Sequence, residues 1–243
     1  MTRNQVAKTL GAGAAIVAIV LAGMLIRSPR VQAQEDDDRD SNDPRIEQGF
    51  AIAPVPLNLD GKNRKLVGLG SYIVNAQGDC NGCHSAGPAT EFLPGGVPYF
   101  NQHPTKINPA TYLGGGNDFG PVSGPPSPHI ITRNLTPSTK TGLPEGDHTF
   151  EQFLTILRTG KDFDHLHPNC SATVTTNCFP PFPPFDGDLL QIMPWPIYSN
   201  MTDHEIRAIY EYLKAIPCIQ GNYPGPGGPA ANIPPEPADR CSK

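Results

Sequence analysis

The amino-acid sequence predicts a mostly α-helical domain with long loops rich in proline and glycine. Three segments, 62–77, 149–160 and 202–217, carry apolar residues at the spacing of a helix that buries one face. Glycine and proline contribute 25 and 29 of the 243 residues, well above ordinary usage. Because such a chain has few regular elements from which to build a core, we expect a large apolar cofactor or disulfides to help stabilise it.

The N-terminus has the layout of a secretory signal. A basic stretch with Arg3 and Lys8 precedes an apolar run over 10–26, and the small-residue sequence VQA at 31–33 follows. We expect cleavage there, so that the mature chain starts at Gln34 and is periplasmic or otherwise exported, either secreted or at the cell surface. The alternative is an uncleaved anchor, since the run reaches the lower end of the roughly 17–25 residues that span a membrane. Membrane association is expected only if this segment is retained.

The rest of the chain divides by composition into a tether, a domain and a tail. Residues 34–60 are expected to form an acidic tether and the segment that leads into the domain. Within them, 35–48 is so rich in charge that we predict a solvated segment. The domain, with insertions, is expected over 61–218, and 219–243 are a Pro/Gly-rich tail without periodicity.

The charge balance excludes some partners. The leader contains four of the 18 basic residues and none of the 23 acidic ones, so 14 basic residues face 23 acidic ones in the remainder. A formal charge of −9 argues against nucleic acid and against an anionic membrane surface as binding partners. It predicts attraction to a basic protein partner, with association that weakens as salt rises.

The first helix, over 62–77, leads into the strongest motif of the chain. Leu66 and Leu69 lie on its apolar face, and Gly78 is placed to end it in a left-handed conformation. Between 85 and 146 the sequence is dominated by Gly, Pro, Asn and Thr, which predicts turns and at most a short hairpin.

The other two helices begin with capping boxes. Thr149 with Gln152 opens the second helix, which Gly160 ends, and Thr202 with Glu205 opens the last. In each pair the hydroxyl and the longer side chain satisfy two backbone N–H groups that the helix itself leaves without partners. The sequence therefore predicts the residue at which each of these two helices begins.

Residues 80–84 read CNGCH, and this is the motif that carries chemistry. If the five residues form a helical turn, the sulfurs of Cys80 and Cys83 and the imidazole of His84 lie on one face. That arrangement suits covalent attachment of one haem through both sulfurs, with His84 as an iron ligand. A zinc site would need a second matched pair, and a thioredoxin-like motif would need a βαβ pattern; the sequence offers neither.

A second axial ligand is needed for a six-coordinate iron. Met193 is the best candidate, because it lies in an apolar loop whose prolines fix the course of the chain and because a thioether suits a Met/His site. Met201 is better explained as the hydrophobic staple before the last helix. The remaining candidates are His103, His129, His148, His165, His167 and His204.

With these motifs in place, the chain resembles the class I cytochrome c family, in particular the monohaem modules of bacterial dehydrogenase electron-transfer chains. The resemblance lies in CNGCH, in the segments ITRNLTPSTKTGL and FLTILRTGKD, and in IMPWPIYSNMTDHEIRAIYEYL. It covers about half of the mature chain. Cytochrome subunits of dehydrogenases often carry several such haem motifs, whereas this sequence has one.

The resemblance implies a cytochrome c-like helical fold around one covalently bound haem c, with Met193 as distal ligand. Carried over by position, Asn134 and Thr136 are expected near the haem propionates, and Trp195 near the ring. Arg133 is added on charge grounds as a propionate partner, although a surface cation is an equally good reading.

Four further cysteines, an even number in an exported protein, favour disulfides. Three pairings are open. Sequence spacing favours Cys170 with Cys178 in the insertion, and Cys218 with Cys241 between the last helix and the tail.

Two functions are compatible with these features. The first is electron transfer, as a soluble carrier or as a subunit of a redox complex, with a dehydrogenase, an oxidase or other cytochromes as partners. The second is a haem enzyme or gas-binding sensor with an open or displaceable sixth iron position. Since no catalytic acid/base pair stands out near the motif, the sequence favours an electron-transfer protein without substrate chemistry of its own.

Overall fold

The computed structural model describes residues 42–121, 129–163, 189–221 and 239–242. The chain divides into two units, Met1–Asp43 and Pro44–Lys243, and the second is described below. The expected signal, residues 34–41 of the acidic tether, and the Cys170 and Cys178 pairing lie outside the described residues. Within the described ranges, no helix is both long enough and apolar enough to cross a membrane.

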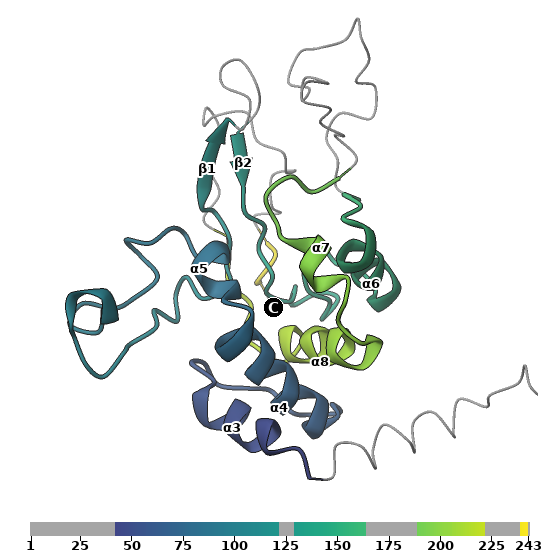
Figure 1. Cartoon of the computed structure of the whole chain (residues 1–243), viewed down its shortest axis with the longest axis horizontal. Helices are drawn as coiled ribbons and strands as arrows, with labels where there is room; N and C mark the ends of the chain where they lie inside the picture. The colour runs from purple at the N-terminus through teal and green to yellow at the C-terminus, as the bar shows by residue number, and fades with distance from the viewer. Residues whose placement is uncertain (1–41, 122–128, 164–188, 222–238, 243) are drawn as a thin grey trace, which may run out of the picture. The chain divides into compact units, whose positions relative to one another are not determined.

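Helices dominate the second unit, as predicted (Figure 1). The α-helices are α3 (Pro44–Ile52), α4 (Arg64–Tyr72), α5 (Cys80–His84), α6 (Phe150–Thr159), α7 (Trp195–Tyr198) and α8 (Asp203–Leu213). The two strands are β1 (Asp118–Pro121) and β2 (His129–Ile131), which pair antiparallel and form the short hairpin that the loop composition allowed.

The crossing of α4 and α8 forms the centre of the core. At Gly70 the two helices approach so closely that a Cβ atom would lie 1.9 Å from the carbonyl oxygen of Ala208. Around this contact Leu69, Ile206 and Leu213 are almost fully buried. Burial of these aliphatic side chains provides the main favourable term for folding, at about 1.5–3 kcal/mol for each.

Helix α3 corrects the prediction of a solvated segment for residues 44–48. From Pro44 the segment is helical and packs on α4, with Ile46 and Gly49 buried. At Gly49 a Cβ atom would lie 1.9 Å from the carbonyl oxygen of Gly68, so this contact also depends on the absence of a side chain. The few apolar residues among many charged ones are placed on one face of a short helix, which the composition did not reveal.

The helix that leads into the motif ends differently from the prediction. Asn63 caps α4 by accepting hydrogen bonds from two backbone N–H groups, and the chain then continues as a π-helix, Ile73–Gln77. Gly78 has φ −88°, so the expected left-handed ending at this residue is wrong. Asp79 instead adopts the left-handed conformation, with φ 45°, immediately before α5.

Both predicted capping boxes are present. The hydroxyl of Thr149 accepts from Gln152 N at the start of α6, and that of Thr202 accepts from Glu205 N at the start of α8. Helix α6 ends at Gly160, which has φ 72° as expected for a left-handed stop.

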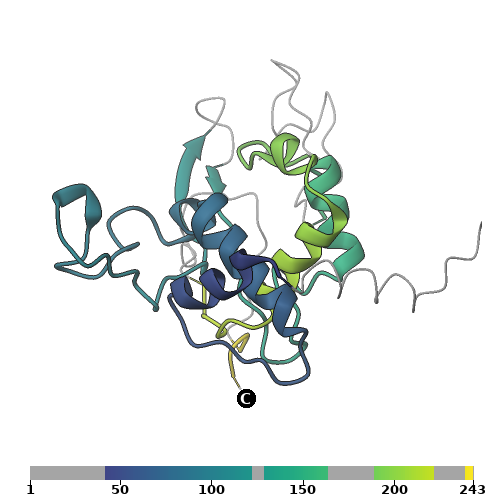
Figure 2. The same cartoon turned by 60° about the horizontal axis from the view of Figure 1, so that its bottom comes forward.

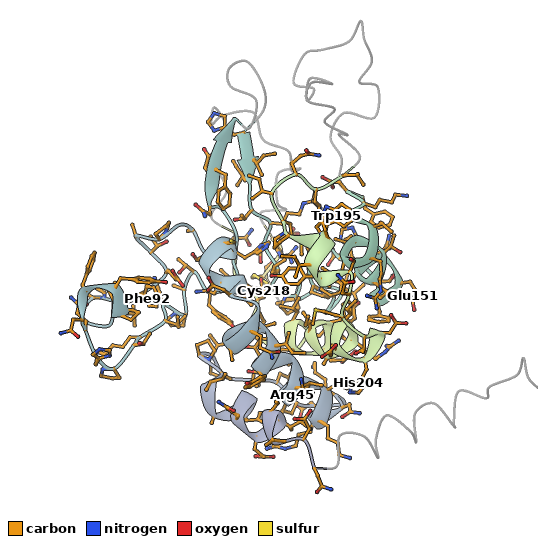
Figure 3. The ribbon with its side chains drawn as sticks, in the orientation of Figure 1. Arg45, Phe92, Glu151, Trp195, His204 and Cys218 are labelled. Atoms are coloured by element: carbon orange, nitrogen blue, oxygen red, sulfur yellow. A yellow bond between two sulfur atoms is a disulfide. The ribbon has the colours of Figure 1, made fainter. Side chains whose placement is uncertain are left out.

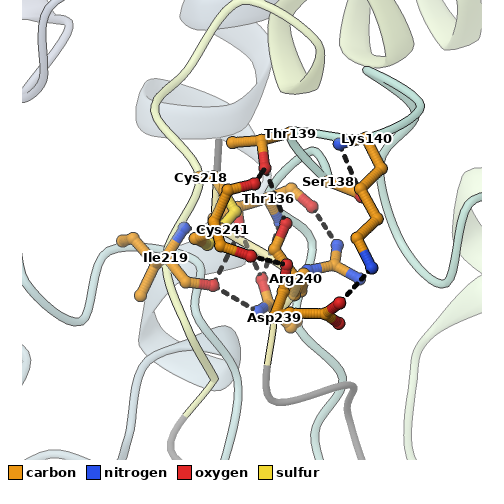
Figure 4. The surroundings of a disulfide bond; sticks show 11 residues. Thr136, Ser138, Thr139, Lys140, Cys218, Ile219, Asp239, Arg240 and Cys241 are labelled. Carbon is orange, nitrogen blue, oxygen red and sulfur yellow. Dashed lines mark hydrogen bonds and ion pairs between the residues drawn. A yellow bond between two sulfur atoms is a disulfide. The ribbon is translucent and has the colours of Figure 1, made fainter.

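A disulfide joins Cys218, after α8, to Cys241 at the end of the tail, as predicted from their spacing. Figure 4 shows its surroundings, in which the hydroxyl of Thr139 donates to the carbonyl of Arg240 and the Arg240 guanidinium donates to the carbonyl of Thr136. The end of the tail is therefore attached covalently to the segment after α8 and by hydrogen bonds to the loop after β2.

Candidate functional site

An apolar cavity lies between the motif helix, the strand pair and the C-terminal helices. In Figure 2 these elements form a ring, with α5 and the strands on one side and α6 and α7 on the other. The aliphatic and aromatic residues that line the cavity include Ile73, Val74, Ile130, Ile131, Leu135, Phe153, Ile156, Leu157, Leu190, Ile192, Ile209 and Leu213. A cavity of this composition suits a large apolar ligand with a few polar attachment points.

The two cysteines and the histidine of the motif lie at this cavity. Cys80, Cys83 and His84 form the helical turn α5, as predicted, and all three line the cavity. Burial, with Asp79 as the next cause, raises the pKa of Cys80 to about 12 and raises that of Cys83. Both free thiols are therefore protonated at neutral pH, which is unlike the thiolate of a redox or nucleophilic cysteine.

His84 is held in a defined orientation. Its Nδ1 lies 2.8 Å from the backbone carbonyl of Arg133, so Nδ1–H donates and Nε2 is left for a metal. Burial lowers the pKa of His84, although this hydrogen bond opposes the effect. A neutral imidazole with its other nitrogen engaged by a carbonyl is the form in which histidine ligates metals.

Met193 lies at the same cavity, on the segment that carries α7. Leu190 N donates to the carbonyl of Gly160 at 2.8 Å and so attaches the segment to the end of α6. Within the segment, the indole of Trp195 donates to the carbonyl of Leu190 at 3.1 Å. The structure therefore brings the thioether of Met193 to a cavity shared with both thiols and His84.

Arg133 also lines the cavity, but its guanidinium has partners within the protein. It forms ion pairs with Glu145, at 3.6 Å, and with Asp162, and all three side chains are buried. Burial raises the pKa of Glu145, but the interaction with His148, 3.6 Å away, and the charge of Arg133 outweigh it, so the net pKa is lowered. No pattern in the sequence indicated the two acidic partners, which lie in loops.

The other residues assigned by resemblance are not brought to the cavity. Asn134 and Thr136 hydrogen-bond to each other at 2.7 Å, and Asn134 donates to the carbonyl of Ile219 at 2.8 Å. Trp195, labelled in Figure 3, packs against Gly160, where a Cβ atom would lie 2.3 Å from the indole. In the described structure these residues fix loops around the site.

No histidine other than His84 lines the cavity among the described residues. His129 pairs with Asp118 on the strand pair, and buried His148 pairs with Glu145. Met201 packs against the core next to α8, in agreement with its assignment as a staple residue. Nor do the described residues contain a group of three His, Cys, Asp or Glu side chains placed to hold a metal. Tyr198, which the sequence did not single out, also lines the cavity.

Comparison with known proteins agrees with the site. Over 167 residues the chain is 28% identical to the gluconate 2-dehydrogenase cytochrome c subunit of Pantoea cypripedii, covering 67% of this chain and 26% of that protein. Over 160 residues it is 24% identical to the fructose dehydrogenase cytochrome subunit of Gluconobacter japonicus, covering 66% and 22%. No family model and no solved structure matches. The chain thus spans about a quarter of the length of these relatives, and the similarity supports a cytochrome c-like family.

Proposed function

We propose that the chain is an exported, monohaem c-type cytochrome that transfers electrons. Cys80 and Cys83 would hold the haem covalently, and His84 and Met193 would be the two axial ligands of its iron. The observation that carries the proposal is the single apolar cavity that these four side chains share. Two thiols, an anchored imidazole and a thioether form the donor set of a Met/His c-type site.

The residues of the cavity fit a haem. Its aliphatic and aromatic walls exclude water from a large apolar ring, and the carbonyl of Arg133 fixes the tautomer and orientation of His84. When bound, the haem supplies reversible one-electron chemistry at its iron. The thioether of Met193 would favour the reduced state, and with His84 and Met193 both holding the iron no open site for a substrate would remain.

A dehydrogenase is the partner that the comparisons favour, because both relatives are named as cytochrome subunits of dehydrogenases. The chain would accept electrons there, either as a subunit or as a soluble carrier, and pass them to an oxidase or another cytochrome. The negative charge of the mature chain favours basic contact surfaces on these partners. The N-terminal signal pattern supports export of the protein to the periplasm or beyond it.

The proposal is tested by spectra of the purified ferrous protein with and without carbon monoxide, together with a pyridine haemochrome assay. We expect one haem c per chain and a ferrous spectrum that carbon monoxide barely changes at neutral pH. A colourless protein from a host that matures c-type cytochromes would refute the haem. Rapid and complete binding of carbon monoxide would instead favour the haem enzyme or gas sensor.

A further inference from the structure

Tyr198 connects the two sides of the cavity. Its hydroxyl donates to the backbone carbonyl of Gly78 at 3.1 Å, across 120 positions of the sequence. Gly78 lies two residues before Cys80, and a Cβ atom on it would lie 3.0 Å from the Cys80 sulfur and 4.0 Å from the Tyr198 hydroxyl. Tyr198 therefore contacts the side of the cavity at which α5 begins.

The segment that contains Met193 and Tyr198 is held on its other side by α6. The guanidinium of Arg158 donates to the carbonyl of Ser199 at 2.5 Å, next to Tyr198. Figure 1 shows α7 beside α6, on the opposite side of the site from α5. The Tyr198 hydrogen bond to Gly78 links this segment to the side of the cavity that carries the motif helix.

The link between Tyr198 and Met193 is short and stiff. Five positions separate the two residues, and Pro194 and Pro196 fix two φ angles between them. Within this stretch Trp195 N donates to the carbonyl of Met193 at 2.8 Å, and Ile197 N donates to that of Pro194 at 3.0 Å. A displacement of the tyrosine is therefore transmitted to the methionine.

We propose that Tyr198 is a positioning residue that keeps Met193 on the iron by tying its segment to Gly78. The inference rests on the proposed function, in which Met193 is the distal ligand. Without the hydroxyl, the segment remains attached to α6 but can move away from α5, and the thioether then leaves the iron more often. Burial raises the pKa of Tyr198 to about 12, so the phenol stays a hydrogen-bond donor throughout the neutral range.

The test is the rate at which carbon monoxide binds to the ferrous holoprotein. From the net effect of one hydrogen bond, we expect Tyr198→Phe to bind carbon monoxide about threefold to tenfold faster than the wild type. Tyr198→Leu, which also lacks the hydroxyl, should show at least the same acceleration. A lower reduction potential in both variants is the second expected sign, because weaker thioether ligation stabilises the ferrous iron less.

Tyr210→Phe is the matched control. Tyr210 also donates its hydroxyl to a backbone carbonyl, that of His148 at 2.9 Å, but it does not line the cavity. We expect this variant to lose stability while its carbon monoxide rate and reduction potential stay at wild-type values. Equal acceleration in Tyr210→Phe and Tyr198→Phe would overturn the inference, because the effect would then be general loosening of the fold.

Met193→Ala separates failure of the inference from failure of the proposed function. If this variant binds carbon monoxide rapidly while Tyr198→Phe matches the wild type, the ligand assignment holds and the role of Tyr198 is refuted. If Met193→Ala itself matches the wild type, Met193 is not the distal ligand, and the role of Tyr198 is refuted with it.

Discussion

Replacing Arg133 with methionine should destabilise the protein strongly, because it removes a cation between two buried carboxylates. The side chains of Arg133, Glu145 and Asp162 are 8%, 6% and 7% exposed. Breaking a buried ion pair by removing one partner costs about 3–5 kcal/mol. That is a large fraction of the roughly 5–15 kcal/mol by which domains are stable. The assay is guanidinium unfolding of the holoprotein, followed by far-UV circular dichroism.

The loss of stability in Arg133→Met should depend on pH in a definite direction. In the wild type the lowered pKa of Glu145 contributes stability that is present above its unfolded value of 4.5 and is lost as pH falls through the folded pKa. Without Arg133, burial has less opposition and the pKa of Glu145 rises. The stability deficit of Arg133→Met should therefore be largest near pH 7 and should shrink as pH is lowered toward 4.

Two comparisons make the reasoning refutable. Adding Glu145→Gln and Asp162→Asn to Arg133→Met should recover most of the lost stability, since no unpaired buried charge then remains. Lys140→Met, which breaks an exposed pair with Asp239, should cost at most about 1 kcal/mol. A loss below about 1 kcal/mol in Arg133→Met, or a deficit independent of pH, would contradict the account of the buried cluster.

Three further changes test the packing of the fold. Gly70→Ala should cost about 1–3 kcal/mol or more in guanidinium unfolding, because the new methyl would collide with the backbone of Ala208 at the α4–α8 crossing. Replacing Cys218 and Cys241 by serine should lower the free energy of unfolding by about 2–4 kcal/mol under non-reducing conditions. Thr202→Ala should cost about 1 kcal/mol in the same assay, because it removes the N-cap of α8.

Each of these has a contrary outcome. An unchanged midpoint in Gly70→Ala would mean that the helices are further apart than described. A double serine variant as stable as the wild type under non-reducing conditions would show that the Cys218–Cys241 disulfide contributes little to stability. A Thr202→Ala variant as stable as the wild type would show that the capping box contributes little to the helix.

Local patterns in the sequence predicted most of the elements that form the site. The CNGCH turn and the two capping boxes depend on residues three or four positions apart, so their spacing is visible without the fold. The pairing of Cys218 with Cys241 was also accessible, because few cysteines compete for partners. The place of Met193 at the cavity could also be predicted, because its loop is apolar and flanked by proline.

Contacts between segments distant in the sequence could not be predicted from local patterns. Helix α3 shows only Ile46 and Phe50 at helical spacing within a charged stretch, and its stability comes from packing on α4. The ending of the first helix was mispredicted because a glycine at the right distance does not fix a left-handed conformation when the chain can continue as a π-helix. The partners of Arg133 and of Tyr198 lie in segments that only the fold brings together.

The most direct test of the haem assignment is peptide mapping of the mature protein after extraction with acidic acetone. We expect the pigment to stay with the polypeptide and one peptide, containing Cys80 and Cys83, to carry the mass of a single haem. Complete extraction of the pigment, or an unmodified peptide from a fully matured sample, would contradict covalent attachment at these cysteines.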